Sequence, residues 1–329
     1  MIPQATLVLA NHRPETVPAA LSLMTGYDAV ILEEPPDDRF PEMLAGRLDI
    51  DAYLATQDLE YPEFSRRMAK GLRQRHLQGT LLYQVEPFIE HLLAIHERFA
   101  DGQGPADLPV GTTLHQVYLA ERAATKALID FYSASAGGGF TNLLAAVRRF
   151  ARADAQRFNL RDRLRAAAIP DLLKRPGRTF IEAGQIHFPL WGELRRRLPT
   201  GFALRVHFLM ADAVRTMGYH RHLYGPGDRL TLLYRFHPNG RFREAERLAA
   251  QALIYNKIII KEEITDVGEP YPHTRDELEV AALTEGLTIT DCRRLYPVVR
   301  RADTRTAREM VQHYLRRSSS TSRRLALTQ

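Results

Sequence analysis

Histidine and glutamate side chains occur where four short apolar runs of this chain end. In chain order they are His12, Glu33 with Glu34, Glu86, and Glu182 with His187. Imidazole and carboxylate groups are ligands that divalent cations prefer. Both groups also act as general acids and bases. A carboxylate at the end of an apolar strand must stay solvated or find a partner, because burying it unpaired is unfavourable. The pattern therefore indicates a site for metal-assisted or acid–base chemistry.

We predict that a divalent cation binds at this site, lowers the pKa of a bound water molecule and polarises a carbonyl group. The predicted metal ligands are His12, Glu33, Glu86 and His187. Glu34 or Glu182 is the predicted general base, and Arg161 is predicted to stabilise a developing oxyanion. These residue types suit Mn, Co, Zn and Fe alike, so the sequence does not identify the metal.

Each of these residues also has a structural interpretation. His12 can cap the helix that follows, and Glu33 with Glu34 can be a solvated pair before Pro35 and Pro36. Asp162 can belong to the first turn of an ordinary helix, where an acidic residue is favourable. No single motif decides between these interpretations. The convergence of four strand ends on one edge of a sheet favours the functional interpretation.

The elements that must position these side chains are strands alternating with helices. Six apolar runs are predicted strands, which cover residues 6–10, 28–33, 80–85, 178–183, 203–209 and 229–234. Residues 257–260 could form a further short strand. Helical periodicity between them predicts an α/β fold with a mainly parallel central sheet flanked by helices. The carboxyl ends of parallel strands meet at one edge, where open sheets bind ligands.

The predicted organisation has three parts. Residues 1–240 form an α/β core with a helical insertion at about 88–169, and residues 241–315 form a mostly helical C-terminal region. Residues 316–329 include Ser318-Ser-Ser-Thr-Ser and are predicted to be a disordered tail, because they are polar and serine-rich.

The order of these motifs resembles the TraB/Tiki group of the superfamily that includes ChaN and erythromycin esterase. In that group, a strand ending in Gly-x-x-His precedes a helix and a strand ending in Glu, as His12 precedes Glu33 here. An Arg-Asp pair that opens a helix then precedes a second Gly-x-x-His, as Arg161-Asp162 precedes Gly184-Gln-Ile-His187. The first motif reads Leu9-Ala-Asn-His12 and lacks the glycine. The resemblance implies a metal-dependent hydrolase, or a binding or regulatory protein with the same fold.

Composition bounds the other function classes. The chain has 329 residues, ordinary hydrophobic content and one cysteine, Cys292, which excludes an internal disulfide and favours a reducing, cytoplasmic location. No stretch approaches the roughly 20 apolar residues of a membrane span, so we expect no membrane partner. The net charge is +6, with ten arginines between Arg293 and Arg324. These have no interleaved ladder of aromatic residues and no recognition motif, so we expect a solvated helix face rather than nucleic-acid binding.

Three functions follow, in order of preference. The first is a metal-dependent hydrolase of an ester, lactone or peptide bond, acting on a small molecule or a peptide. The second is a non-catalytic binding or regulatory protein that keeps the fold. The third is a nucleic-acid-associated factor that uses the arginine-rich C-terminus. The sequence leaves a homo-oligomer open.

Overall fold

The computed structural model describes residues 4–57, 59–137, 139–174, 177–265 and 268–326. The chain forms two compact units. Unit 1 comprises residues 1–125, 156–222 and 263–272, and unit 2 comprises residues 126–155, 223–262 and 273–329. The structure thus divides the chain differently from the predicted boundary at 240, because the helices of the insertion contribute to both units. In the described residues, no helix combines the length and the apolar composition of a membrane span.

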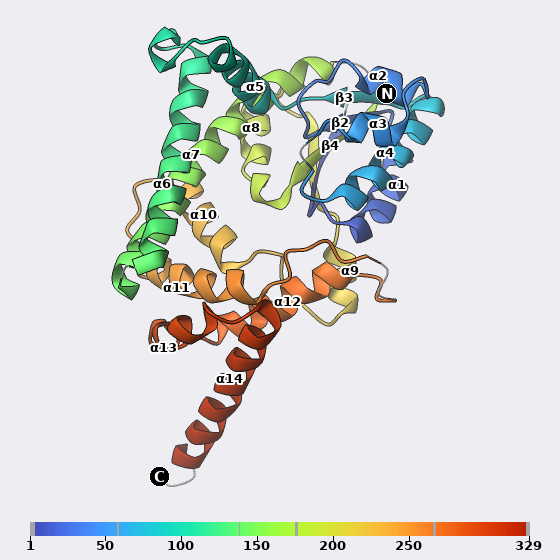
Figure 1. The fold of residues 1–329 in the computed structure, drawn as a ribbon. Coiled ribbons are helices and arrows are strands. Elements are labelled where there is room, and N and C mark those ends of the chain that lie inside the picture. The colour runs from blue at the N-terminus through green and yellow to red at the C-terminus, as the bar shows by residue number, and fades with distance from the viewer. Residues whose placement is uncertain (1–3, 58, 138, 175–176, 266–267, 327–329) are drawn as a thin grey trace. The chain divides into compact units, whose positions relative to one another are not determined.

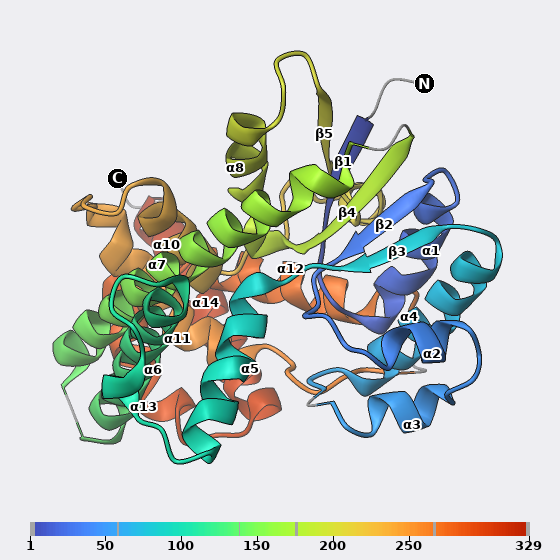
Figure 2. The same ribbon diagram turned by 90° about the horizontal axis from the view of Figure 1, so that it is seen from above.

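Unit 1 is built on a five-stranded, entirely parallel sheet, which confirms the α/β class (Figure 2). The strands are β1 (Gln4–Ala10), β2 (Ala29–Leu32), β3 (Leu81–Gln84), β4 (Arg178–Gly184) and β5 (Ala203–Phe208). Their order in the sheet is β3-β2-β4-β1-β5. The first five predicted strands therefore exist at the predicted places.

Helices cover both faces of this sheet (Figure 1). Those wholly in unit 1 are η1 (Pro14–Thr16), α1 (Val17–Met24), α2 (Phe40–Leu44), α3 (Ile50–Leu54), α4 (Pro62–Leu77), α5 (Pro87–Ala100), η2 (Pro105–Asp107), η3 (Gln185–His187), α8 (Leu190–Arg197) and α9 (Ala211–Thr216). Two long helices, α6 (Thr113–Gly137) and α7 (Phe140–Leu172), begin in one unit and end in the other. On one face, Leu7 and Ile181 of the strands pack in an apolar layer with Ile169 of α7 and Leu190 of α8.

The neighbouring strands β1 and β4 mark the switch point of the sheet. They are hydrogen-bonded along their length, with Ala10 paired to Gly184. The helix that follows β1 is α1 and the helix that follows β4 is α8, and these lie on opposite faces of the sheet (Figures 1 and 2). In open α/β sheets, ligands bind outside the carboxyl ends of strands at such a point. The predicted site residues His12 and His187 follow these two strands.

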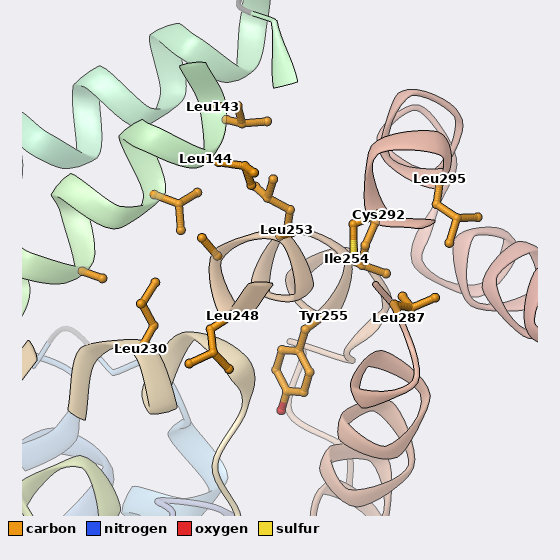
Figure 3. Packing of buried hydrophobic residues seen from close by; sticks show 14 of the residues in the cluster. Leu143, Leu144, Leu230, Leu248, Leu253, Ile254, Tyr255, Leu287, Cys292 and Leu295 are labelled. Carbon is orange, nitrogen blue, oxygen red and sulfur yellow. The ribbon is translucent and has the colours of Figure 1, made fainter. Parts of the chain in front are cut away.

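In its described residues, the regular secondary structure of unit 2 consists of helices. Besides the parts of α6 and α7, it contains α10 (Pro226–Phe236), α11 (Arg243–Ile258), α12 (Pro272–Glu285, from His273 on), α13 (Ile289–Val299) and α14 (Thr304–Ala326). The central helix α11 packs against α10, α13 and α14. Leu253 and Ile254 of α11 lie in its core with Leu144 and Leu295 (Figure 3). Cys292 is a free, buried thiol in the same core.

Three predicted elements differ in the structure. The predicted strand 229–234 lies in α10, and the optional strand at 257–260 coincides with the end of α11. Short apolar runs suit both element types, and here Leu230 and Tyr234 are buried at helical spacing. The Asp228 carboxylate accepts a hydrogen bond from the Gly225 N–H at 2.9 Å, which closes the start of α10. A disordered tail was predicted from residue 316 on, but the backbone is helical to Ala326. Residues 304–326 contain neither Gly nor Pro, so nothing in this sequence interrupts the helix. Residues 327–329 lie outside the described part of the chain.

Candidate functional site

His187 is held between two carboxylates in the interior of unit 1. It lies in η3, directly after β4, and its Nε2 is 2.8 Å from Oε1 of Glu33, which follows β2. On the other side of the ring, Nδ1 contacts Oδ1 of Asp162 in α7. All three side chains are at most 6% exposed. A neutral imidazole has a single N–H, so only the protonated ring can donate to both carboxylates at once.

The positive charge of His187 and the negative charges of the carboxylates favour one another's charged forms. Burial alone would lower the pKa of His187, but the carboxylates of Glu33 and Asp162 outweigh burial and raise that pKa above its usual value. Burial would also raise the pKa of Glu33, but the charges of His187 and then Arg165 hold it well below its usual value. The contact is therefore an imidazolium–carboxylate pair. His187 is a structural cation here rather than a free base.

Arg161 connects Glu33 and Glu86, two of the predicted metal ligands. Its Nη2 lies 3.1 Å from Oε2 of Glu86 and 3.4 Å from Oε1 of Glu33. Glu86 is almost fully buried, whereas 18% of the Arg161 side chain is exposed. Within the described residues, Nε of Arg161 and Oε1 of Glu86 are buried without a hydrogen-bond partner. Arg161 thus keeps an unused donor and Glu86 an unused acceptor within the described residues.

Arg165, one turn further along α7, ties the strand ends to the helix. Its guanidinium is fully buried and donates to the main-chain carbonyl oxygens of Val85, at 2.8 Å, and Glu182, at 2.7 Å. Its Nη1 also lies 3.7 Å from Oε2 of Glu33, and that oxygen accepts a hydrogen bond from the Gly184 N–H at 2.6 Å. The ends of β2, β3 and β4 are therefore fixed relative to one another by charge-assisted hydrogen bonds.

His12 and Glu182 form a second part of the site. Nε2 of His12 is 3.6 Å from Oε1 of Glu182, and the His12 ring stacks on Phe64 of α4 with centroids 5.1 Å apart. Nε2 is buried and has no hydrogen-bond partner among the described residues. The His12 side chain as a whole is 36% exposed, in contrast to His187. Of these two histidines, His12 is the one that can accept a new partner.

Glu34 is partly buried and held by Gln84, the last residue of β3. Gln84 donates from Nε2 to Oε2 of Glu34 at 2.9 Å, and its Oε1 accepts from the Asp37 N–H at 3.0 Å. Burial raises the pKa of Glu34 to about 7; the Gln84 hydrogen bond opposes this rise, and the charge of Glu182 adds to it. A carboxyl group with this pKa is present in both protonation states near neutral pH, as an acid–base catalyst requires.

The structure thus groups most of the predicted site residues at the predicted edge of the sheet, in two sets. Glu33, Glu86, His187 and Arg161 form one connected cluster, whereas His12 contacts Glu182 instead of the other predicted ligands. The prediction that Arg161-Asp162 opens a helix was wrong. Both residues lie inside α7, because no glycine or proline interrupts the sequence from Phe140 to Asp162.

These contacts do not fit the predicted four-ligand metal centre. No group of three or more His, Cys, Asp or Glu side chains in the described ranges is arranged to hold one metal ion. Both ring nitrogens of His187 already contact carboxylates, and Arg161 bridges Glu33 and Glu86. A divalent cation placed there would be repelled by the guanidinium groups of Arg161 and Arg165. In this arrangement the arginines supply the positive charge that a cation would supply.

Sequence reasoning missed Arg165 and Gln84. Arg165 follows Arg161 by four residues, so helical spacing places both on one face, and this signal was present in the sequence. Gln84 is an amide at a strand end, whereas the site residues predicted at the strand ends are carboxylates and imidazoles. No comparable signal distinguishes it from other polar residues that follow strands.

The structure also explains the missing glycine of the first Gly-x-x-His motif. Leu9 occupies that position, is fully buried and packs in the apolar layer with Ile181 and Leu190. In the second motif, a Cβ on Gly184 would lie 3.7 Å from Oε2 of Glu33, an ordinary contact distance. Neither position requires glycine for its backbone conformation.

Comparison with known proteins finds a relative of similar extent. No family model matches the chain, and no solved structure matches it significantly. An uncharacterized protein of Archaeoglobus fulgidus is 26% identical over 291 residues, which are 88% of this chain and 97% of that protein. The similarity therefore extends over nearly the whole of both proteins. The resemblance to the TraB/Tiki group stays a prediction.

Proposed function

We propose that the chain is a hydrolase that cleaves an acyl bond, such as an ester, lactone or peptide bond, by general acid–base catalysis. The observation that supports this most is the His12–Glu182 pair at the switch point of the sheet. Nε2 of His12 lacks a hydrogen-bond partner among the described residues and faces a carboxylate oxygen 3.6 Å away. A single water molecule can bridge two atoms at this separation. Such a water is the nucleophile of the proposed reaction.

The proposed steps use one base and one acid. His12 takes a proton from the bridging water, whose oxygen attacks the carbonyl carbon of the substrate. Glu182 orients the water and stabilises the imidazolium that forms. Glu34, whose pKa of about 7 keeps part of it protonated at neutral pH, donates a proton to the leaving group. Proton transfer from His12 to Glu34 through solvent then restores both groups.

Arg161 is the proposed electrostatic stabiliser of the reaction. It is the partly exposed member of the two arginines, and its Nε–H is unused within the described residues. A donor aimed at the developing oxyanion typically contributes about 10²–10³ in kcat. Arg165 is fully buried, and its hydrogen bonds fix the strand ends instead.

A non-catalytic binding or regulatory protein is the second candidate. This candidate is favoured because the charges of Glu33, His187 and Asp162 are paired with one another and need no substrate as a partner. The metal-dependent reaction also stays a prediction, and so do a cytoplasmic location, a small-molecule or peptide substrate and a homo-oligomer. We do not propose nucleic acid as a partner.

A turnover assay separates these candidates. The full chain is tested against panels of aryl esters, lactones and short peptides, beside His12→Gln and the control His96→Gln, which changes an exposed histidine of the same unit. We expect turnover that His12→Gln lowers by about 10²–10⁴-fold and His96→Gln leaves unchanged. Equal rates for wild type and His12→Gln would contradict the proposed role of His12, and absence of turnover on every panel would favour a binding protein.

A further inference from the structure

The first turn of α4 contacts both His12 and the residue after it. The His12 ring stacks on Phe64 with an angle of 18° between the ring planes. The Arg13 guanidinium lies over the ring of Tyr61, 4.0 Å from its centroid. Tyr61 precedes the first residue of α4, and Phe64 is its third residue. The position of the proposed base therefore depends on where this turn lies.

This turn lacks a cap from its own sequence. The first N–H groups of a helix have no partner within the helix and need an acceptor from elsewhere. Tyr61, at the N-cap position, makes no side-chain hydrogen bond to the turn, and Pro62 has no N–H. The next two residues, Glu63 and Phe64, have N–H groups that need an acceptor from outside the helix.

Glu263 supplies both acceptors from a distant part of the chain. Its Oε2 accepts from the Glu63 N–H and its Oε1 accepts from the Phe64 N–H, each at 2.9 Å. Glu263 belongs to the segment 263–272, which is part of unit 1. A carboxylate at a helix N-terminus is also stabilised by the helix dipole. Two hydrogen bonds accepted by one planar carboxylate fix both the position and the rotation of the turn.

We infer that Glu263 is a positioning residue for His12, acting through the first turn of α4 and the ring of Phe64. The inference rests on the proposed function of His12. It follows from two contacts that share one residue, because the amide of Phe64 is bound by Glu263 and its ring is stacked on His12. Displacement of the turn by a few tenths of an ångström would move the imidazole relative to Glu182. Misplacing a catalytic group by about 1 Å can lower a rate by about 100-fold.

The test is an NMR measurement of the His12 ring on the folded, full-length chain. Protons stacked over an aromatic ring are displaced upfield by its ring current, and Phe64→Leu gives the value without this ring. His12→Gln identifies the signals, and the exposed His96 serves as an internal reference. Glu262→Ala is the matched control, since it removes an exposed charge next to Glu263.

We expect Glu263→Ala to move the His12 signals toward the Phe64→Leu value and to leave His96 unchanged. Glu263→Gln keeps one acceptor oxygen, so its signals should lie between wild type and Glu263→Ala. Glu262→Ala should match wild type. Signals of folded Glu263→Ala at the wild-type position would overturn the inference. If that variant does not fold, wild-type signals in Glu263→Gln would overturn it. The measurement does not need turnover, so an inactive chain with displaced signals would contradict the proposed hydrolase and leave this inference standing.

Discussion

Glu33 and His187 are separated by more than 150 residues in the sequence, yet Oε1 of Glu33 lies 2.8 Å from Nε2 of His187. The register of the sheet accounts for this contact. Strands β2 and β4 are parallel neighbours in which Ile31 pairs with Ile181. Residues that follow both strands therefore reach the same edge, and Asp162 closes the group from α7.

The first prediction concerns this ion pair. His187→Gln removes the positive charge between two buried carboxylates, so we expect the free energy of unfolding to fall by about 3–5 kcal/mol. The His187 contribution is present below its unfolded pKa near 6.5 and is lost as pH rises through its higher folded pKa. The Glu33 contribution is lost as pH falls through its folded pKa, below 4.5. Urea unfolding of wild type and His187→Gln should therefore differ most between about pH 5 and 6.5. A pH-independent difference below about 1 kcal/mol would show that the pair is not formed.

The second prediction concerns Glu34. Its folded pKa of about 7 exceeds the usual 4.5, so between these values the native chain binds more protons than the unfolded chain. Stability contributed by this group therefore falls as pH rises from about 5 to 7. Glu34→Gln should remove that decline and be more stable than wild type at pH 7. The check is the thermal midpoint across pH 5–8, and parallel curves for the two proteins would argue against a buried, protonated Glu34.

The third prediction separates the two arginines of α7. Arg165→Met leaves two buried carbonyl oxygens and part of the Glu33 charge unpaired, and should lower stability by about 3–5 kcal/mol. Arg161→Gln should lower stability less, because Arg161 is partly exposed, but should lower kcat by about 10²–10³. Denaturant midpoints and initial rates measured on both variants test this. The reverse ranking would mean that their proposed roles are exchanged.

The fourth prediction concerns the glycine position of each Gly-x-x-His motif. Gly184→Ala should change stability by less than about 1 kcal/mol, because its Cβ meets no close atom and its backbone suits any residue. Leu9→Gly restores the glycine of the first motif but removes a fully buried side chain, so we expect a loss of about 3–5 kcal/mol. Thermal unfolding of the two variants measures both effects. A strongly unstable Gly184→Ala would mean that the second motif needs its glycine, and a tolerated Leu9→Gly would mean that the Leu9 side chain contributes little to the core.

The sequence predicted the parallel sheet and the edge at which the site lies. Apolar runs bounded by turn residues identified β1 to β5, and the residues after them identified His12, Glu33, Glu86 and His187. It did not predict that residues 229–234 belong to a helix, α10, because this apolar run suits a strand and a helix equally well.

The contacts within the site were less predictable than its location. Pairing depends on side-chain geometry, so the sequence could not show that Arg161 bridges Glu33 and Glu86 or that His12 meets Glu182. Glu263 binds an amide 199 residues away in the chain, and no local pattern indicates such a contact. Strand periodicity locates a site, whereas the charges around each group decide its chemistry.

The most direct test of the account is the hydrolysis rate after removal of divalent cations. The full chain is treated with a chelator, freed of it, and assayed for kcat/KM from pH 5 to 9 on the best substrate of the ester, lactone and peptide panels, beside His12→Gln and Glu34→Gln. The proposed acid–base mechanism predicts that the chelated wild type keeps its rate, that His12→Gln loses about 10²–10⁴-fold, and that Glu34→Gln loses the change of rate near pH 7. Loss of the wild-type rate on chelation, with recovery on addition of Mn, Co, Zn or Fe, would contradict the account and establish the metal-dependent reaction instead.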